Sequence, residues 1–154
     1  AEILSVQIKD EHGNLNSNIY AGDKFSIEIH FIINRDLVNL NVAFRLRNKL
    51  GVKVTTWGTL NEDMKGGSPD DPELFWNKSF PAGASSKVCF SGTCLLAADL
   101  YEVEAIVALE YDFHYRNQRI LHWKDEAAYF NVRLRTDRYV FDGISDIGMR
   151  SRNV

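Results

Sequence analysis

Apolar and polar residues alternate with a period of two along most of this chain, and that alternation constrains the fold more than any other feature. It is clearest over 24–34 (KFSIEIHFIIN), where one side carries Phe25, Ile27, Ile29, Phe31 and Ile33. Four further segments alternate in the same way: 4–8, 40–47, 101–110 and 129–135. No window of 11–18 residues has a helical period, so helix is expected to be nearly absent. Half-buried strands between Gly-, Asp- and Asn-rich turns predict antiparallel sheets with one face toward water.

Seven or more such strands in 154 residues predict an all-β fold, an immunoglobulin-like antiparallel β-sandwich. The length suits one domain over 1–154. The strands at 40–48, 51–59, 101–110 and 128–134 are expected to share one sheet. We expect 61–73 (NEDMKGGSPDDPE) to be the longest irregular segment and 111–119 (YDFHYRNQR) to be a protruding hairpin loop.

Composition and motifs narrow the function classes. The net charge is −3 and the 18 basic residues are scattered, which argues against nucleic-acid binding. GxSxG, HExxH, GxxxxGK[ST] and GxGxxG are all missing, and the histidines lack ligand spacing. The acidic residues of 61–73 are interpreted as a solvated loop rather than a calcium site, and Glu102 and Glu104 lie on one strand, unlike a glycosidase pair. We therefore predict a binding module without metal or cofactor, not an enzyme.

The two cysteines, Cys89 and Cys94, flank Ser91 and Gly92. A two-residue turn there would set the thiols opposite each other across a hairpin, placed to form a disulfide. A single pair is no disulfide scaffold, and it lacks the second pair that a structural zinc requires. Free thiols in a reducing compartment are the favoured interpretation.

The segment 54–59 (VTTWGT) places a tryptophan on the side of a strand that alternation assigns to water. A type I turn with Gly51 in the left-handed conformation sets the pairing, which then brings Ala43 opposite Trp57. A slip of one residue would oppose Phe44 to Trp57 and mix the two faces. The first register is therefore predicted, with the indole exposed.

An exposed indole among hydrogen-bonding side chains suits a sugar, because a pyranose stacks its C–H face on the ring while its hydroxyls reach polar neighbours. The site expected on this face comprises Trp57, Arg45, Thr55, Ala43, Glu104, Tyr129 and Asn131, with Arg47, Lys53 and His30 as secondary candidates. His30 falls on the outside of the other sheet. The competing interpretation of Trp57 is a ring covered by 61–73, or a lone surface aromatic.

Four features follow one another along the chain: a D-x-x-G turn, a Gly-Asp lead into a long strand, an N-x-x-G turn and a final strand with spaced Trp, Phe and Val, at 10–13, 22–23, 48–51 and 123–132. This order of turns and strands resembles the C-terminal domain of the ATP-binding subunit of O-antigen polysaccharide ABC transporters, the Wzt type. The resemblance covers nearly the whole chain and includes no catalytic signature.

This resemblance implies a domain that binds the transporter's own polysaccharide and recognises the modification at its non-reducing terminus, coupling chain termination to export. It implies a cytoplasmic position at the inner membrane, with membrane subunits as partners and a nucleotide-binding domain that is absent here. The chain begins in strand-like sequence without Met, so we expect a fragment of a larger subunit. A homodimer is expected, with 136–154 as a candidate strand for exchange between subunits. No sugar-contacting residue of the family is transferred.

The alternative function is a protein-interaction β-sandwich. It predicts a contiguous exposed apolar patch around Ile32, Ile106 and Ala108.

Overall fold

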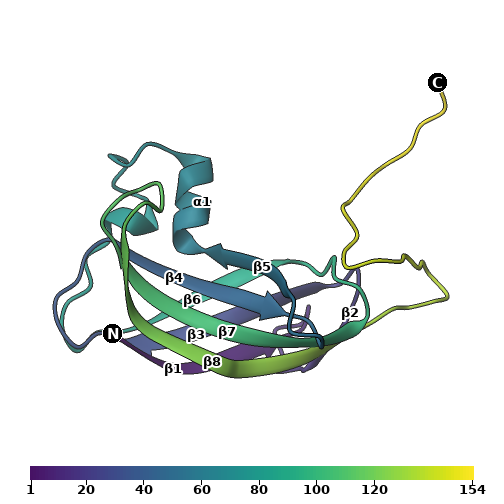
Figure 1. The fold of residues 1–154 in the computed structure, drawn as a ribbon, viewed down its shortest axis with the longest axis horizontal. Coiled ribbons are helices and arrows are strands. Elements are labelled where there is room, and N and C mark those ends of the chain that lie inside the picture. The colour runs from purple at the N-terminus through teal and green to yellow at the C-terminus, as the bar shows by residue number, and fades with distance from the viewer.

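Two β-sheets face each other in the computed structural model, which describes residues 1–154 (Figure 1). The three-stranded sheet has the order β1 (Glu2–Lys9), β3 (Lys24–Ile32), β6 (Ser85–Thr93). The five-stranded sheet has the order β2 (Asn18–Tyr20), β8 (Gln118–Arg133), β7 (Asp99–Glu110), β4 (Leu40–Arg47), β5 (Lys53–Gly58). Only the short β2–β8 pairing is parallel. The predicted all-β, immunoglobulin-like sandwich is confirmed, and the four strands expected to share a sheet do so.

The core lies between the sheets and is built from the inward side of each alternating strand. Ile27, Ile29 and Phe31 of β3 are fully buried. From the other sheet, Tyr101 of β7 stacks on Phe130 of β8 with ring centroids 5.5 Å apart. Burial raises the pKa of Tyr101 to about 12. The alternation in the sequence thus reflects strands that each turn one side to the core and the other to solvent.

One edge of the sandwich is closed and the other is open. At the closed edge, the Ile3 N–H donates to Nδ1 of His122 at 2.8 Å, which links β1 to β8. At the opposite edge, β5 and β6 end their sheets with no strand beside them. We call this side the open edge.

The segment predicted to be irregular, 61–73, instead contributes to a helix, α1 (Thr59–Gly66), and a 3-10 turn, η1 (Phe75–Asn77), follows it. The prediction was wrong for 61–66, because tertiary contacts hold this short helix, whereas 67–73 forms neither helix nor strand. The Gly58 N–H donates to Oδ1 of Asn61 at 2.8 Å, and the Leu60 N–H donates to Oδ1 of Asn41 in β4 at 3.2 Å. A helix of this length gives too little periodicity to be read from sequence.

No hairpin turn forms at Ser91 and Gly92, because β6 runs through both residues and pairs with β3 as far as Thr93. Consequently the cysteines do not face each other. Cys89 is exposed, Cys94 is buried, and both are free thiols, as the favoured interpretation had it.

The loop between β7 and β8 is confirmed at 111–117, and it packs against η1 and α1. Phe113 is buried, and its ring meets Trp76 edge to face with centroids 5.5 Å apart. In Figure 1 this loop and α1 stand over the same end of the five-stranded sheet. We call α1, η1 and the 111–117 loop the cap.

The residues after β8 form no strand within this chain. One isolated bridge joins Ser145 to Leu96, and the tail then runs away from the sandwich (Figure 1). Several large apolar side chains of the tail are exposed: Val140, Ile144, Ile147, Met149 and Val154. The exchange of 136–154 between subunits stays a prediction.

Candidate functional site

Trp57 does not face the water side of its sheet. The turn forms as predicted, with Gly51 at φ 76°, but the pairing shifts between Leu46 and Arg47. Val54 is left unpaired, so that Phe44 lies opposite Trp57. The predicted register holds next to the turn, where Arg47 pairs with Lys53, and is wrong from Leu46 onward, where the rejected one-residue slip is the true pairing. Val54 is half-buried against the core, which local alternation could not reveal.

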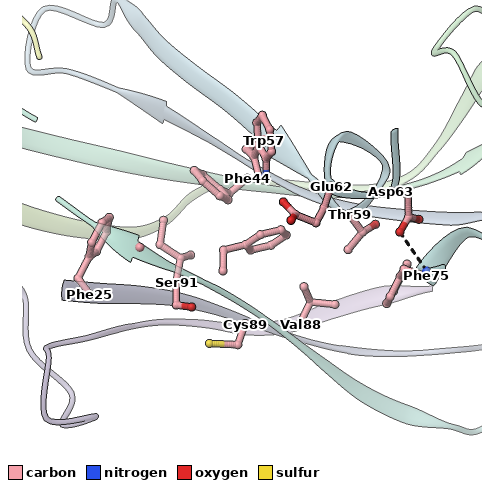
Figure 2. Close-up of a pocket in the computed structure, with 13 residues that line it drawn as sticks. Phe25, Phe44, Trp57, Thr59, Glu62, Asp63, Phe75, Val88, Cys89 and Ser91 are labelled. Carbon is pink, nitrogen blue, oxygen red and sulfur yellow. Dashed lines mark hydrogen bonds between the residues drawn. The ribbon is translucent and has the colours of Figure 1, made fainter. Parts of the chain in front are cut away.

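The shift turns Trp57 and Thr55 toward the inner side of the sheet. Trp57 lines a cavity at the open edge together with Phe44 (Figure 2). Thr56 takes the outward place instead, where its Oγ1 accepts a hydrogen bond from Nε of Arg45 at 3.2 Å. Neither Trp57 nor Thr55 belongs to the outward-facing group of side chains.

The outward side of the five-stranded sheet, called here the outer face, has a buried ion cluster at its centre. Glu104 is 4% exposed. Its Oε1 accepts from Nε of Arg47 at 2.6 Å, and its Oε2 lies 3.4 Å from Nη1 of Arg45. The hydrogen bond with Glu104 raises the pKa of Arg47. A buried carboxylate between two guanidinium groups orients both of them, leaving other N–H donors available.

Beside this cluster stands a tryptophan that the sequence analysis did not select. Trp123 pairs with Ile106 on the outer face and is 41% exposed. The guanidinium carbon of Arg45 lies 4.7 Å from the centroid of its ring. One face of the indole is thus held by a cation that is itself fixed by Glu104, while much of the ring remains in solvent.

Strand β8 widens next to the cluster. Its pairing with β7 shifts between Val103 and Ala105, and Glu126 there has a φ of 46°. The Glu126 N–H donates to Oε1 of Glu102 at 3.1 Å. Tyr129 follows, opposite Glu102, and partial desolvation together with its hydrogen bond to Glu126 raises its pKa. A non-glycine residue in the left-handed region is locally strained, and such strain concentrates at functional sites.

The cap forms a wall at one end of the outer face through a buried polar network. Nδ2 of Asn41 donates to Oε1 of Glu110 at 2.9 Å and to the hydroxyl of Tyr115 at 3.0 Å. That hydroxyl donates in turn to Oδ1 of Asn61 at 2.9 Å. Burial raises the pKa of Tyr115 to about 12 and also raises that of Glu110. The network ties strand β4, helix α1 and the loop into one rigid border.

The structure brings together most of the expected site but not all of it. The outer face carries Ala43, Arg45, Arg47, Lys53, Glu104, Tyr129 and Asn131. Trp57 and Thr55 lie on the inner side of β5, and His30 lies on the other sheet, where its Nε2 is 2.6 Å from Oγ of Ser85. Trp123 and Thr56 were missed. Counting back seven positions from the inward Phe130 assigns Trp123 to the outer face, so that signal was present in the sequence.

Other classes of site receive no support. No group of three or more His, Cys, Asp or Glu side chains is arranged to hold a metal ion. The apolar patch that a protein-interaction domain would show is not formed, because Ile106 and Ala108 are buried and Ile32 lies on the other sheet. None of the helices combines the length and apolar composition that crossing a bilayer requires.

Comparison with known proteins points in one direction. A family model described as the Wzt C-terminal domain matches residues 1–147. The fold is similar to a solved structure described as the "Crystal structure of the C-terminal domain of wzt", with a TM-score of 0.80 and 10% sequence identity. That match covers 99% of this chain and 83% of the other. No curated protein matches the sequence. Since the family model spans nearly the whole chain, this protein belongs to the family of Wzt C-terminal domains.

Proposed function

We propose that this domain is a non-catalytic module that binds the non-reducing terminus of an O-antigen polysaccharide on the outer face and so couples chain termination to export. Membership of the Wzt C-terminal domain family supports a carbohydrate-binding role in O-antigen export in general. Wzt is the ATP-binding subunit of an ABC transporter, and its C-terminal domain is a non-catalytic part of that subunit. Recognition of the non-reducing chain end on the outer face is our proposal.

The arrangement of Trp123, Arg45 and Glu104 carries this proposal. The exposed part of the indole offers a platform for the C–H face of a pyranose, and stacking of this kind tolerates different sugars. Arg45 is held between Trp123 and Glu104, at 4.7 Å from the ring centroid and 3.4 Å from the carboxylate. A donor fixed in this way loses little conformational entropy when it bonds a hydroxyl.

The site extends along the sheet from Trp123 to Tyr129 and Asn131. Their partners on β7 are Ile106, Glu102 and Leu100. Ile106 lies four positions after Glu102 in β7, which is about 13 Å of extended strand. The stretch of β8 from Trp123 to Asn131 therefore has room for more than one sugar residue, with Tyr129 and Asn131 as flanking contacts.

The arginines of the outer face offer a place for an anionic group on the glycan. Arg45, Arg47 and Lys53 face outward among the carboxylates of Glu102, Glu104, Asp125 and Glu126. Because Glu104 is buried, it offsets the arginines without presenting a free carboxylate to the ligand. A phosphate or carboxylate at the chain end would pair with Arg45, whose planar fork matches such groups.

The test is binding of the purified domain to its cognate O-polysaccharide, with and without the terminal modification. We expect binding to depend on that modification. Trp123→Ala should weaken it by about 1–3 kcal/mol, the range found for stacking on an aromatic side chain. Trp57→Ala is the matched control, because it removes an indole from the inner side of the same sheet. Circular dichroism and thermal unfolding show whether each variant is folded.

Either of two outcomes would overturn the assignment. Binding lost in a folded Trp57→Ala variant but kept in Trp123→Ala would move the site to the open edge. Equal binding to both forms of the polysaccharide would remove chain-end recognition, leaving a module that binds the repeating unit.

We also propose that the domain works at the cytoplasmic side of the inner membrane, joined through its parent chain to the nucleotide-binding and membrane parts of the transporter, and that it forms a homodimer. The exposed apolar side chains of 136–154 support an exchange of this tail between subunits, because burial in a partner would remove them from water. Light scattering should give a dimer for the full chain and a monomer once residues 144–154 are deleted. A truncated chain that stays dimeric would assign the interface to the sandwich itself.

A further inference from the structure

The open edge contains a cavity of about 460 Å³, within the range of small-molecule sites. Aromatic rings from both sheets line it, with Phe44 and Phe90 edge to face at a centroid distance of 5.1 Å. Trp57 lies at one side and Phe75 closes an end (Figure 2). These rings are only half-buried, so the core of the sandwich is not sealed here.

The charged side chains that line the cavity, Glu62 and Asp63 of α1, are both acidic. Asp63 is already satisfied, because its two oxygens accept the N–H groups of Phe75 and Trp76 at 3.1 and 2.7 Å. Glu62 forms no hydrogen bond and no ion pair within the chain, and Figure 2 shows its carboxylate directed into the cavity. An unpaired carboxylate beside apolar walls is complementary to a cation.

The aromatic walls attract cations as well. Nζ of Lys65 lies 4.6 Å from the ring centroid of Trp57, and Nζ of Lys78 lies 5.7 Å from that of Phe75. Two rings that line the cavity thus already have ammonium groups of the chain over their faces. The quadrupole of an aromatic ring favours this contact, most strongly for tryptophan.

We propose that this cavity binds an organic cation, an ammonium group attached to an aromatic or branched apolar body. The ammonium lies between Glu62 and the indole of Trp57, and the body lies among Phe44 and Phe90. An anionic ligand would meet the Glu62 carboxylate, and a sugar would bring more hydroxyl groups than Glu62, Thr59 and Ser91 could pair among the apolar lining residues. The cavity is on the inner side of the sheet, so this site is separate from the proposed polysaccharide site on the outer face.

Two probes of nearly equal shape test the proposal on the full chain: 2-phenylethylammonium and the neutral 2-phenylethanol. Each is titrated while the indole N–H signal of Trp57 is followed by NMR. The ammonium probe should bind at least about tenfold more tightly than the alcohol, as expected for a charge-assisted contact. Glu62→Gln should remove that preference without changing binding of the alcohol. Glu73→Gln, which removes an exposed carboxylate that does not line the cavity, should leave the preference intact.

A second variant tests the role of the ring face. Lys65→Met removes the chain's own ammonium from Trp57, so the ammonium probe should bind severalfold more tightly. Equal binding of the two probes, an unshifted Trp57 signal, or weaker binding to Lys65→Met would overturn the proposal. Polysaccharide binding measured on the same Glu62→Gln variant should be unchanged, which separates a failure here from a failure of the outer-face proposal.

Discussion

Glu110 has a buried carboxyl with one oxygen unaccounted for. The residue is 2% exposed, and Oε1 accepts from Asn41 while Oε2 has no partner. Burial raises its pKa above the ordinary 4.5, and the bond from Asn41 offsets this only in part. Ionised carboxylates are poorly tolerated without solvation or a partner, so this group stabilises the fold best when it is protonated.

We therefore predict that Glu110→Gln makes the domain more stable at neutral pH. Below pH 4.5 the carboxyl is neutral in both the folded and the unfolded state, and the variant should resemble the wild type. As the pH rises, the unfolded chain ionises first, so the wild type loses stability until the folded pKa is passed. The glutamine stays neutral throughout. Urea unfolding across this pH range measures the difference in the free energy of unfolding between variant and wild type. A stability gain of the variant that shrinks as the pH rises would contradict a raised pKa for Glu110.

Strand β4 and helix α1 approach so closely that only a glycine fits between them. A Cβ on Gly58 would lie 2.6 Å from Oδ1 of Asn41, 2.8 Å from Cβ of Ala43 and 3.1 Å from the carbonyl oxygen of Val42. All three neighbours belong to β4, which is paired on both sides, so they cannot move freely. Gly58 is thus the joint at which the cap meets the sheet.

The variant Gly58→Ala should lower the free energy of unfolding by about 1–3 kcal/mol, the usual cost of forcing an extra methyl group into packed surroundings. Gly66→Ala is the matched control, because a Cβ there meets nothing within 4 Å. Replacing glycine by alanine inside a helix is favourable by up to about 1 kcal/mol. Chemical denaturation of the two variants should give shifts of opposite sign, and a neutral Gly58→Ala would show that the cap sits more loosely than described.

The strands could be predicted because each is long enough to repeat its in–out alternation several times. What failed were features that depend on distant residues. Val54 leaves the ladder to pack on the core, and this moved Trp57 to the inner side. Helix α1 is held by Asn41, which bonds its first residues, Thr59 and Leu60, from eighteen and nineteen positions earlier in the chain. The outward position of Trp123 could be predicted, because the bulge at 125–127, between it and Phe130, adds two residues and so preserves the alternation.

At the scale of the whole molecule, the backbone amides of a central strand should be better protected from solvent than those of a strand at the end of a sheet. Strand β7 is paired on both sides, with β8 and β4, and most of its residues are buried. Strands β5 and β6 are edges, so half of their amides have no partner in a ladder.

Amide hydrogen exchange should therefore be slowest in β7 and faster along the strands that end a sheet, β5 and β6 as well as β1 and β2. The measurement needs only the wild-type domain, at concentrations low enough to keep association constant. Protection of β6 equal to that of β7 would contradict an open edge in solution, and its loss on dilution would identify a second copy as the cover.

The bulge in β8 gives this domain a place where side chains can be exchanged. Between Lys124 and Ala128 the strand has two residues more than the facing stretch of β7, yet β8 pairs with β7 directly before it, at 122–124, and directly after it, from Ala128. The identity of those surplus residues can change without moving any neighbouring pair. The choice of glycan can thus change through residues in the middle of a sheet, where side chains are held rigidly, rather than through residues of a loop at its rim. A designer seeking a new glycan preference would begin with these residues, since the paired residues on either side of the bulge keep their positions when its side chains are exchanged.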